Sequence, residues 1–178
     1  GNQTLEFILQ EYDNYDELLQ ALQDREIDMI FYTGRNPYLA EEKGYALTNT
    51  VWTYSLMAVT DEKNFDENEV YTVAVPKEKE ALKQHIAFSY PQWKLADYDS
   101  LDDAADMVTN GKVDCFLMGA SQAMIYDNSQ NFKSIPLTKT MEACFAVKTG
   151  EGILLSILNK TLKAMPSDML TSALAIYD

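Results

Sequence analysis

One structural unit occurs twice in this chain, and its spacing limits the fold more than any other feature. In both copies an amphipathic helix leads through a turn to Ile-Asp or Val-Asp and then to a short apolar strand. The two aspartates, Asp28 and Asp114, lie 86 residues apart. The matched helix positions are Tyr15 with Leu101, Leu19 with Ala105, and Leu22 with Val108. Solenoid repeats have periods of roughly 20–50 residues, so this spacing predicts two lobes of similar build.

Residues that favour helix ends flank both copies. Asn14, with Glu17 three residues later, is typical of a capping box. Either Asp99 or Ser100 takes the capping position of the second helix, and Asn110-Gly111 is typical of its C-terminal end.

The remaining apolar patterns predict alternating helices and strands, which is typical of the α/β class. We expect strands over residues 4–9, 27–31, 51–60, 70–75, 93–96, 113–118, 132–137 and 142–148. We expect helices over residues 15–24, 37–43, 77–86, 101–109, 121–127, 152–165 and 167–176.

The charge of the chain excludes several classes of partner. Its 28 acidic and 14 basic residues give a formal net charge of −14. Nucleic-acid binding depends on Lys and Arg side chains that neutralise phosphates, and adhesion to anionic lipid depends on the same residues. We therefore expect no nucleic-acid partner, and we attribute the acidity to solubility. No apolar run reaches the roughly 18 residues of a membrane-spanning helix.

The residues that carry enzyme chemistry do not occur in recognisable patterns. His85 is the single histidine, and no second His or Cys lies near it, so we expect neither a metal site nor a catalytic histidine. The sequence has no GxSxG, P-loop or GxGxxG motif. The acidic pairs, such as Glu41-Glu42, fall on predicted solvated surfaces, where burial cannot separate their pKa values. We expect no enzymatic activity and no cofactor.

The two cysteines lie in apolar stretches. Cys115 and Cys144 are interpreted as buried free thiols. A disulfide between them is the alternative, although no spacing indicates one.

In its order of segments the chain resembles a known family. The first half carries ALQDREIDMIF, a short helix, GYALTNTVW and an apolar strand, and the second half carries YTVAVPK, WKLADYDSLDDAADMVTNGKVDCFLMG and EACFAVKTGEGILLSILNKTLKAM. This pattern is similar to the type 2 solute-binding proteins, in the branch that includes polar amino-acid receptors. Each motif is weak alone, and their order and spacing carry the resemblance.

The resemblance implies a two-lobed type 2 periplasmic-binding-protein fold. Lobe 1 would consist of residues 1–60 and 141–178, and lobe 2 of residues 66–138. The hinge crossings would lie near residues 60–65 and 138–141. Relative to the family, lobe 1 looks truncated at its N-terminus by roughly 35 residues, judged from typical domain size. Loss of its first strand would leave an open sheet edge, which predicts a homodimer or another strand-completing partner.

Three positions depart from the amino-acid receptors. Where those receptors carry the arginine that binds the ligand carboxylate this chain has Ala40, and where they carry the acid that binds the ligand amine it has Gly119. Their small-hydroxyl loop is replaced by Pro76-Lys77-Glu78-Lys79. Arg35 either supplies an alternative guanidinium for a carboxylate or is a plain surface residue. Trp52 and Tyr54 are either aromatic residues of the cleft or part of the core.

The residues expected to bind a ligand between the lobes come from both of them. They are Tyr32, Thr33, Arg35, Asn36 and Trp52 in lobe 1, and Lys77, Lys79, Gly119 and Ser121 in lobe 2.

These departures favour an extracytoplasmic sensor domain of a membrane signalling protein, of the histidine kinase or diguanylate cyclase type. We expect it to be periplasmic or on the cell surface, tethered to the membrane in the full-length protein, and to bind a small solute or a partner in the cleft. One alternative is the receptor of an ABC importer for a polar or carboxylate-bearing molecule. The other is a vestigial interaction module without a small ligand.

Overall fold

The computed structural model describes residue 8, residues 10–126 and residues 131–166. Most of the strand expected at residues 4–9 and the helix expected at residues 167–176 lie outside this part of the chain. Within it the α/β class is confirmed, and two separate β-sheets are present.

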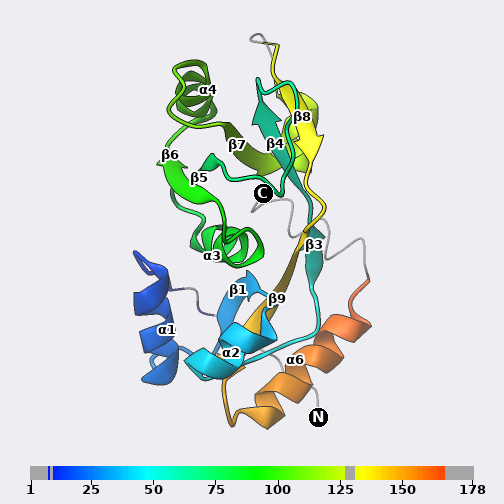
Figure 1. Ribbon diagram of the computed structural model, residues 1–178. Coiled ribbons are helices and arrows are strands. Elements are labelled where there is room, and N and C mark those ends of the chain that lie inside the picture. The colour runs from blue at the N-terminus through cyan, green and yellow to red at the C-terminus, as the bar shows by residue number, and fades with distance from the viewer. Residues whose placement is uncertain (1–7, 9, 127–130, 167–178) are drawn as a thin grey trace.

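The first sheet is antiparallel and is built around one long strand. β9 (Met141–Lys148) pairs with β1 (Ile30–Gly34), β2 (Tyr45–Leu47) and β3 (Trp52–Tyr54). Three helices accompany this sheet in the lower half of Figure 1: α1 (Tyr15–Gln23), α2 (Pro37–Lys43) and α6 (Gly152–Ala164).

The second sheet is mixed and has the strand order β6-β5-β7-β4-β8. Its strands are β4 (Leu56–Thr60), β5 (Thr72–Pro76), β6 (Lys94–Tyr98), β7 (Cys115–Gly119) and β8 (Lys133–Pro136). β5 is parallel to β6 and β7, whereas β4 is antiparallel to β7 and β8. Its helices are α3 (Glu80–Ser89), α4 (Leu101–Thr109) and the short α5 (Ala120–Ile125). In Figure 1 α4 lies at the top of the molecule and α3 lies near the middle, just above β1.

The predicted repeat is reproduced down to individual hydrogen bonds. Asn14 and Ser100 cap α1 and α4 with their side chains. At the other end of each helix two consecutive backbone N–H groups donate to the same carbonyl. Residues 26 and 27 donate to the Ala21 carbonyl, and residues 112 and 113 donate to the Met107 carbonyl. Both turns pass through a left-handed residue, with φ of 60° at Arg25 and 72° at Gly111.

These closing turns explain why two strands begin later than predicted. Ile27 and Val113 each donate their N–H to the end of the preceding helix, so neither is available to a sheet. β1 therefore begins at Ile30 and β7 at Cys115. The sequence does not separate these turns from the strands, because buried apolar residues look alike in a turn and in a strand.

The strand predicted over residues 51–60 is two strands in different sheets. β3 pairs with β9 in the first sheet, and after Ser55 the chain continues as β4, which pairs with β7 and β8 in the second. By sheet membership the first crossing therefore falls at Ser55, not near residues 60–65, and residues 56–60 lie in the sheet assigned to lobe 2. The second crossing lies between β8, which ends at Pro136, and β9, which begins at Met141.

Three groups of buried side chains stabilise this arrangement. One lies between α1, α2 and the first sheet and includes Leu22 and Ile30. A second lies between α4 and the second sheet. The third lies under α3 and reaches from Ile86 to Met141 and Ala143 in the first sheet, so apolar packing continues from one lobe into the other. Cys115 and Cys144 are buried free thiols, as predicted.

The two aspartates of the repeat have different surroundings. The Asp114 carboxylate accepts the N–H of Thr72 at 2.8 Å, and its backbone N–H donates to the Thr72 carbonyl at 2.8 Å, so it joins β7 to β5. Asp28 is exposed, and β1 has no strand on the corresponding side among the residues that the structure describes.

We predict that Asp114→Ala lowers the free energy of unfolding by about 1–3 kcal/mol, because the Thr72 N–H loses its acceptor. Asp28→Ala is the matched control and should change it by less than about 0.5 kcal/mol, since exposed side chains contribute little. Urea unfolding followed by circular dichroism measures both. Equal losses in the two variants would contradict the different roles assigned to these residues.

Candidate functional site

The two crossings place one aromatic side chain, Tyr54, between the lobes. Leu56 pairs with Gly119, and Ala120 donates its N–H to the Ser55 carbonyl at 2.9 Å, so the end of β7 lies beside the first crossing. A Cβ atom placed on Gly119 would lie 2.5 Å from the Tyr54 Oη and 2.9 Å from its Cζ. The Tyr54 ring thus occupies the space in which a side chain at position 119 would stand.

Lys79 approaches the same ring from the start of α3. Its Nζ donates to the Tyr54 Oη at 3.5 Å and lies 5.6 Å from the ring centroid. Two residues predicted for the site, Gly119 and Lys79, therefore meet at Tyr54. From the sequence, Tyr54 is either a core residue or a cleft residue. In the structure its ring packs against the buried side chains under α3 and also lies beside Gly119 and Lys79.

Two further predicted residues, Tyr32 and Trp52, contact each other. Their ring centroids are 5.2 Å apart. Both are half-buried and pack, together with Tyr54, against the group of buried side chains under α3. These aromatic residues give the first sheet an apolar surface toward the second.

α3 completes the contact between the lobes by packing against β1. A Cβ atom on Gly34 would lie 3.8 Å from the His85 Cβ. The backbone of Lys139, in the second crossing, acts to raise the pKa of the His85 ring and so lies near it. His85, on α3 of lobe 2, thus faces β1 of lobe 1 and lies near the second crossing. The sequence did not predict this role, because no local motif surrounds a residue whose contacts are all distant in the chain.

Two predicted site residues serve the local structure of lobe 1. Thr33 is 2% exposed, and its Oγ1 lies 2.6 Å from the Tyr15 Oη in the core behind β1. The Asn36 Oδ1 accepts the N–H of Leu39 and so caps α2. Their polar groups looked available in the sequence, but core packing and helix capping use them.

The other predicted residues do not gather at Tyr54. The Arg35 Nε donates to the Thr48 carbonyl at 3.2 Å, and Arg35 is exposed. The Lys77 Nζ lies 4.0 Å from the Asp99 carboxylate in an exposed pair. Ser121 is exposed in the first turn of α5. Ala40 is buried between α2 and the first sheet, which leaves no room there for an arginine side chain.

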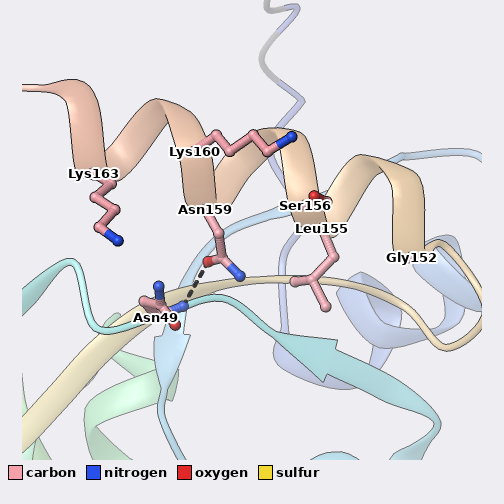
Figure 2. A pocket seen from close by; sticks show the side chains of 7 residues that line it. All are labelled: Asn49, Gly152, Leu155, Ser156, Asn159, Lys160 and Lys163. Carbon is pink, nitrogen blue, oxygen red and sulfur yellow. Dashed lines mark hydrogen bonds between the residues drawn. The ribbon is translucent and has the colours of Figure 1, made fainter.

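A surface pocket of about 410 Å³ lies away from these residues, between α6 and the loop before β3. Figure 2 shows its lining residues, with the Asn159 Oδ1 accepting the N–H of Asn49 at 2.8 Å. Lys160 and Lys163 also line it, and none of the residues predicted for the site does. Among the described residues no cluster of His, Cys, Asp and Glu could hold a metal ion. No described helix is long and apolar enough to cross a membrane.

We predict that Gly119→Ala destabilises the protein by about 1–3 kcal/mol, the usual result of overpacking, because its new methyl group meets the Tyr54 ring. In a Tyr54→Ala background the same substitution should lower the free energy of unfolding by much less. Urea unfolding of the four proteins of this double-mutant cycle measures the coupling. Additive losses would show that Tyr54 does not fill this space in solution.

We also predict a pH dependence that comes from His85. Burial lowers the pKa of His85 below its ordinary value of 6.5, despite the opposing effect of the backbone of Lys139. The unfolded chain therefore binds more protons than the folded chain just below pH 6.5, so the free energy of unfolding should fall as the pH drops through this range. Urea unfolding between pH 7.5 and 5.5 should show this fall to be smaller in His85→Gln. If the free energy of unfolding depends on pH in the same way in both proteins, His85 is not the source of this dependence.

No family model matches the sequence. Over 182 residues the chain is 26% identical to the virulence sensor protein BvgS of Bordetella pertussis; the match covers 96% of this chain but 14% of BvgS. The chain thus spans about a seventh of the length of this relative.

Solved structures agree with this similarity. A double mutant of the BvgS VFT2 domain has a TM-score of 0.65 and 25% identity, over 94% of this chain and 75% of that one. The BvgS periplasmic domain has a TM-score of 0.60 and 26% identity, over 90% of this chain and 33% of that one. The substrate-binding protein of an amino-acid ABC transporter has a TM-score of 0.63 and 20% identity, over 92% and 77% of the two chains. The chain therefore has the two-lobed fold of the type 2 periplasmic binding proteins, and in sequence and structure it is similar to the periplasmic sensor domain of BvgS.

Proposed function

We propose that this chain is an extracytoplasmic sensor domain of a membrane signalling protein, of the histidine kinase or diguanylate cyclase type. The main support for this proposal is the contact between the lobes, in which Tyr54 fills the space beside Gly119 and α3 packs against β1. An input that moves Tyr54 changes how the lobes contact each other, and such a change is what a signalling protein can transmit. The similarity to BvgS supports this function.

The input is a small solute other than an ordinary amino acid, or a partner protein. Ala40 is buried, and the Tyr54 ring stands where an acidic side chain at position 119 would lie. The two groups that bind the carboxylate and the amine in amino-acid receptors therefore have no equivalent at these positions. A solute that enters here has to displace Tyr54 and lies next to the Lys79 ammonium, which favours a compound with an anionic or strongly polar group.

Tethering to a membrane and assembly are also part of the proposal. The output domain, the anchor and a periplasmic or cell-surface location are inferred from the likeness to BvgS. The open side of β1 among the described residues supports the prediction of a homodimer or another strand-completing partner.

A second candidate function is the receptor of an ABC importer, favoured by the likeness in fold to an amino-acid transporter's substrate-binding protein. The absence of the ligand-binding arginine and acid of amino-acid receptors, at Ala40 and Gly119, counts against this second function. The third alternative, an interaction module without a small ligand, predicts that no solute raises the melting temperature, since a ligand that binds only the native state must stabilise it.

A disulfide between the lobes tests the sensor function. The 3.8 Å between a Cβ on Gly34 and the His85 Cβ falls within the range of roughly 3.5–4.5 Å that disulfides require. In the full-length protein, oxidised Gly34→Cys/His85→Cys should hold the signalling output at one level under conditions that switch the parent protein. A thiol reductant should restore switching.

The single variants Gly34→Cys and His85→Cys are the controls for loss of either side chain. An output that still switches while the disulfide is intact would contradict a signal carried by lobe movement. Loss of solute uptake without any change in signalling would instead support the importer.

A further inference from the structure

The second crossing is a short segment between two points of sheet pairing. Leu137 donates its N–H to the Leu56 carbonyl at 3.0 Å and so belongs to the second sheet. Met141 pairs with Tyr54 in the first sheet. Residues 138–140 join these two points, next to the first crossing at Ser55. Figure 1 shows β3 and β9 running together between the two halves of the molecule.

One carboxylate, that of Glu67, is hydrogen-bonded to this segment. Its Oε2 accepts the N–H of Thr138 at 2.9 Å, and its Oε1 accepts the Thr138 hydroxyl. The Tyr90 hydroxyl donates to the same Oε2 at 2.9 Å. Glu67 thus binds both donors of Thr138 and links them to the end of α3.

The loop that carries Glu67 is itself anchored to lobe 2. The Gln92 Nε2 donates to the Glu67 carbonyl at 3.0 Å, and the Trp93 Nε1 donates to the Glu69 carbonyl at 3.1 Å. Trp93 stacks on the fully buried Tyr90, with ring centroids 4.0 Å apart. The carboxylate is therefore held in place by the body of lobe 2.

Lys139 strengthens this arrangement from within the crossing. Its Nζ donates to the Ser89 carbonyl at 2.7 Å and lies 4.7 Å from the centroid of the Tyr90 ring. Partial burial acts to raise the pKa of Glu67, but the hydrogen bonds from Thr138 and Tyr90 and the nearby Lys139 charge outweigh it and hold this pKa below its ordinary 4.5. Glu67 is therefore ionised at neutral pH and accepts charge-assisted hydrogen bonds.

We propose that Glu67 is a hinge latch, which ties Thr138 to lobe 2 and thereby restricts how far the two lobes turn relative to each other. A hinge absorbs rotation in the φ and ψ angles of a few residues, and the latch removes Thr138 from those that are free to change. The inference goes beyond the sensing function and rests on it only in assuming that the lobes move. The latch acts in the same way whichever ligand binds, because Glu67 is hydrogen-bonded to the second crossing and not to residues around Tyr54.

Pulsed electron paramagnetic resonance between the lobes tests the latch. Spin labels are placed on Glu41→Cys in α2 and Asp106→Cys in α4, where both side chains are exposed and the native cysteines are buried. Glu67→Gln keeps the shape of the side chain but loses its charge and one acceptor. We expect a broader and longer distance distribution, together with roughly tenfold faster exchange of the Thr138 amide, in keeping with the loss of hydrogen bonds to a charged group.

Glu69→Gln is the matched control, since it makes the same change on an exposed side chain of the same loop. Thr138→Val removes the hydroxyl donor and should shift the distances in the same direction as Glu67→Gln. This second variant decides the question if Glu67→Gln does not fold. Distances that stay unchanged in both variants, or that change equally in Glu69→Gln, would overturn the latch.

Tyr54→Ala separates failure of the latch from failure of the proposed function. If Tyr54→Ala lengthens the distance between the labels while Glu67→Gln does not, the lobes move and the latch is wrong. If no variant changes the distances, the lobes do not move, and the proposed sensing by lobe movement fails as well.

Discussion

The chain passes from one sheet to the other at two adjacent places, and this adjacency determines the contacts between the lobes. Tyr54 ends the strand before the first crossing and pairs with Met141 just after the second. The same geometry brings the start of α5 to Ser55 and leaves Gly119 directly beside the Tyr54 ring. Only a residue without a side chain fits there, so this part of the packing between the lobes depends on one aromatic ring and one glycine.

The crossings also explain why contact between the lobes and freedom of movement can coexist. Each lobe has its own buried side chains, under α1 and α4 respectively, while the group under α3 extends across the boundary. In the proposed function, movement of the lobes would disturb this third group and the contact of His85 with Gly34, and would leave the other two groups intact. A signal can therefore be a small rearrangement around α3 and not the unfolding of a lobe.

Much of the fold followed from local patterns in the sequence. The repeat, its caps and its closing turns were predictable because they depend on residues within one helix and the turn after it. The split at Ser55 was not, since both halves of the run from Val51 to Thr60 are apolar and only their partners in different sheets separate them. Of the residues expected to bind a ligand, Gly119, Lys79, Tyr32 and Trp52 lie at the contact between the lobes, whereas Thr33 packs in the core and Asn36 caps a helix. Ligand binding by the first four stays a prediction. Glu67 carries no local signal, because its partners, Thr138 and Tyr90, are distant in the chain.

The contact between the lobes is made by the chain's own side chains, at Tyr54 and Gly119 and where α3 packs against β1. Residual dipolar couplings of the backbone amides, measured on the protein with no solute added, report the relative orientation of the two sheets. The account predicts that one alignment tensor fits the strands of both sheets in the orientation described. Couplings that require a different relative orientation of the two sheets would contradict it.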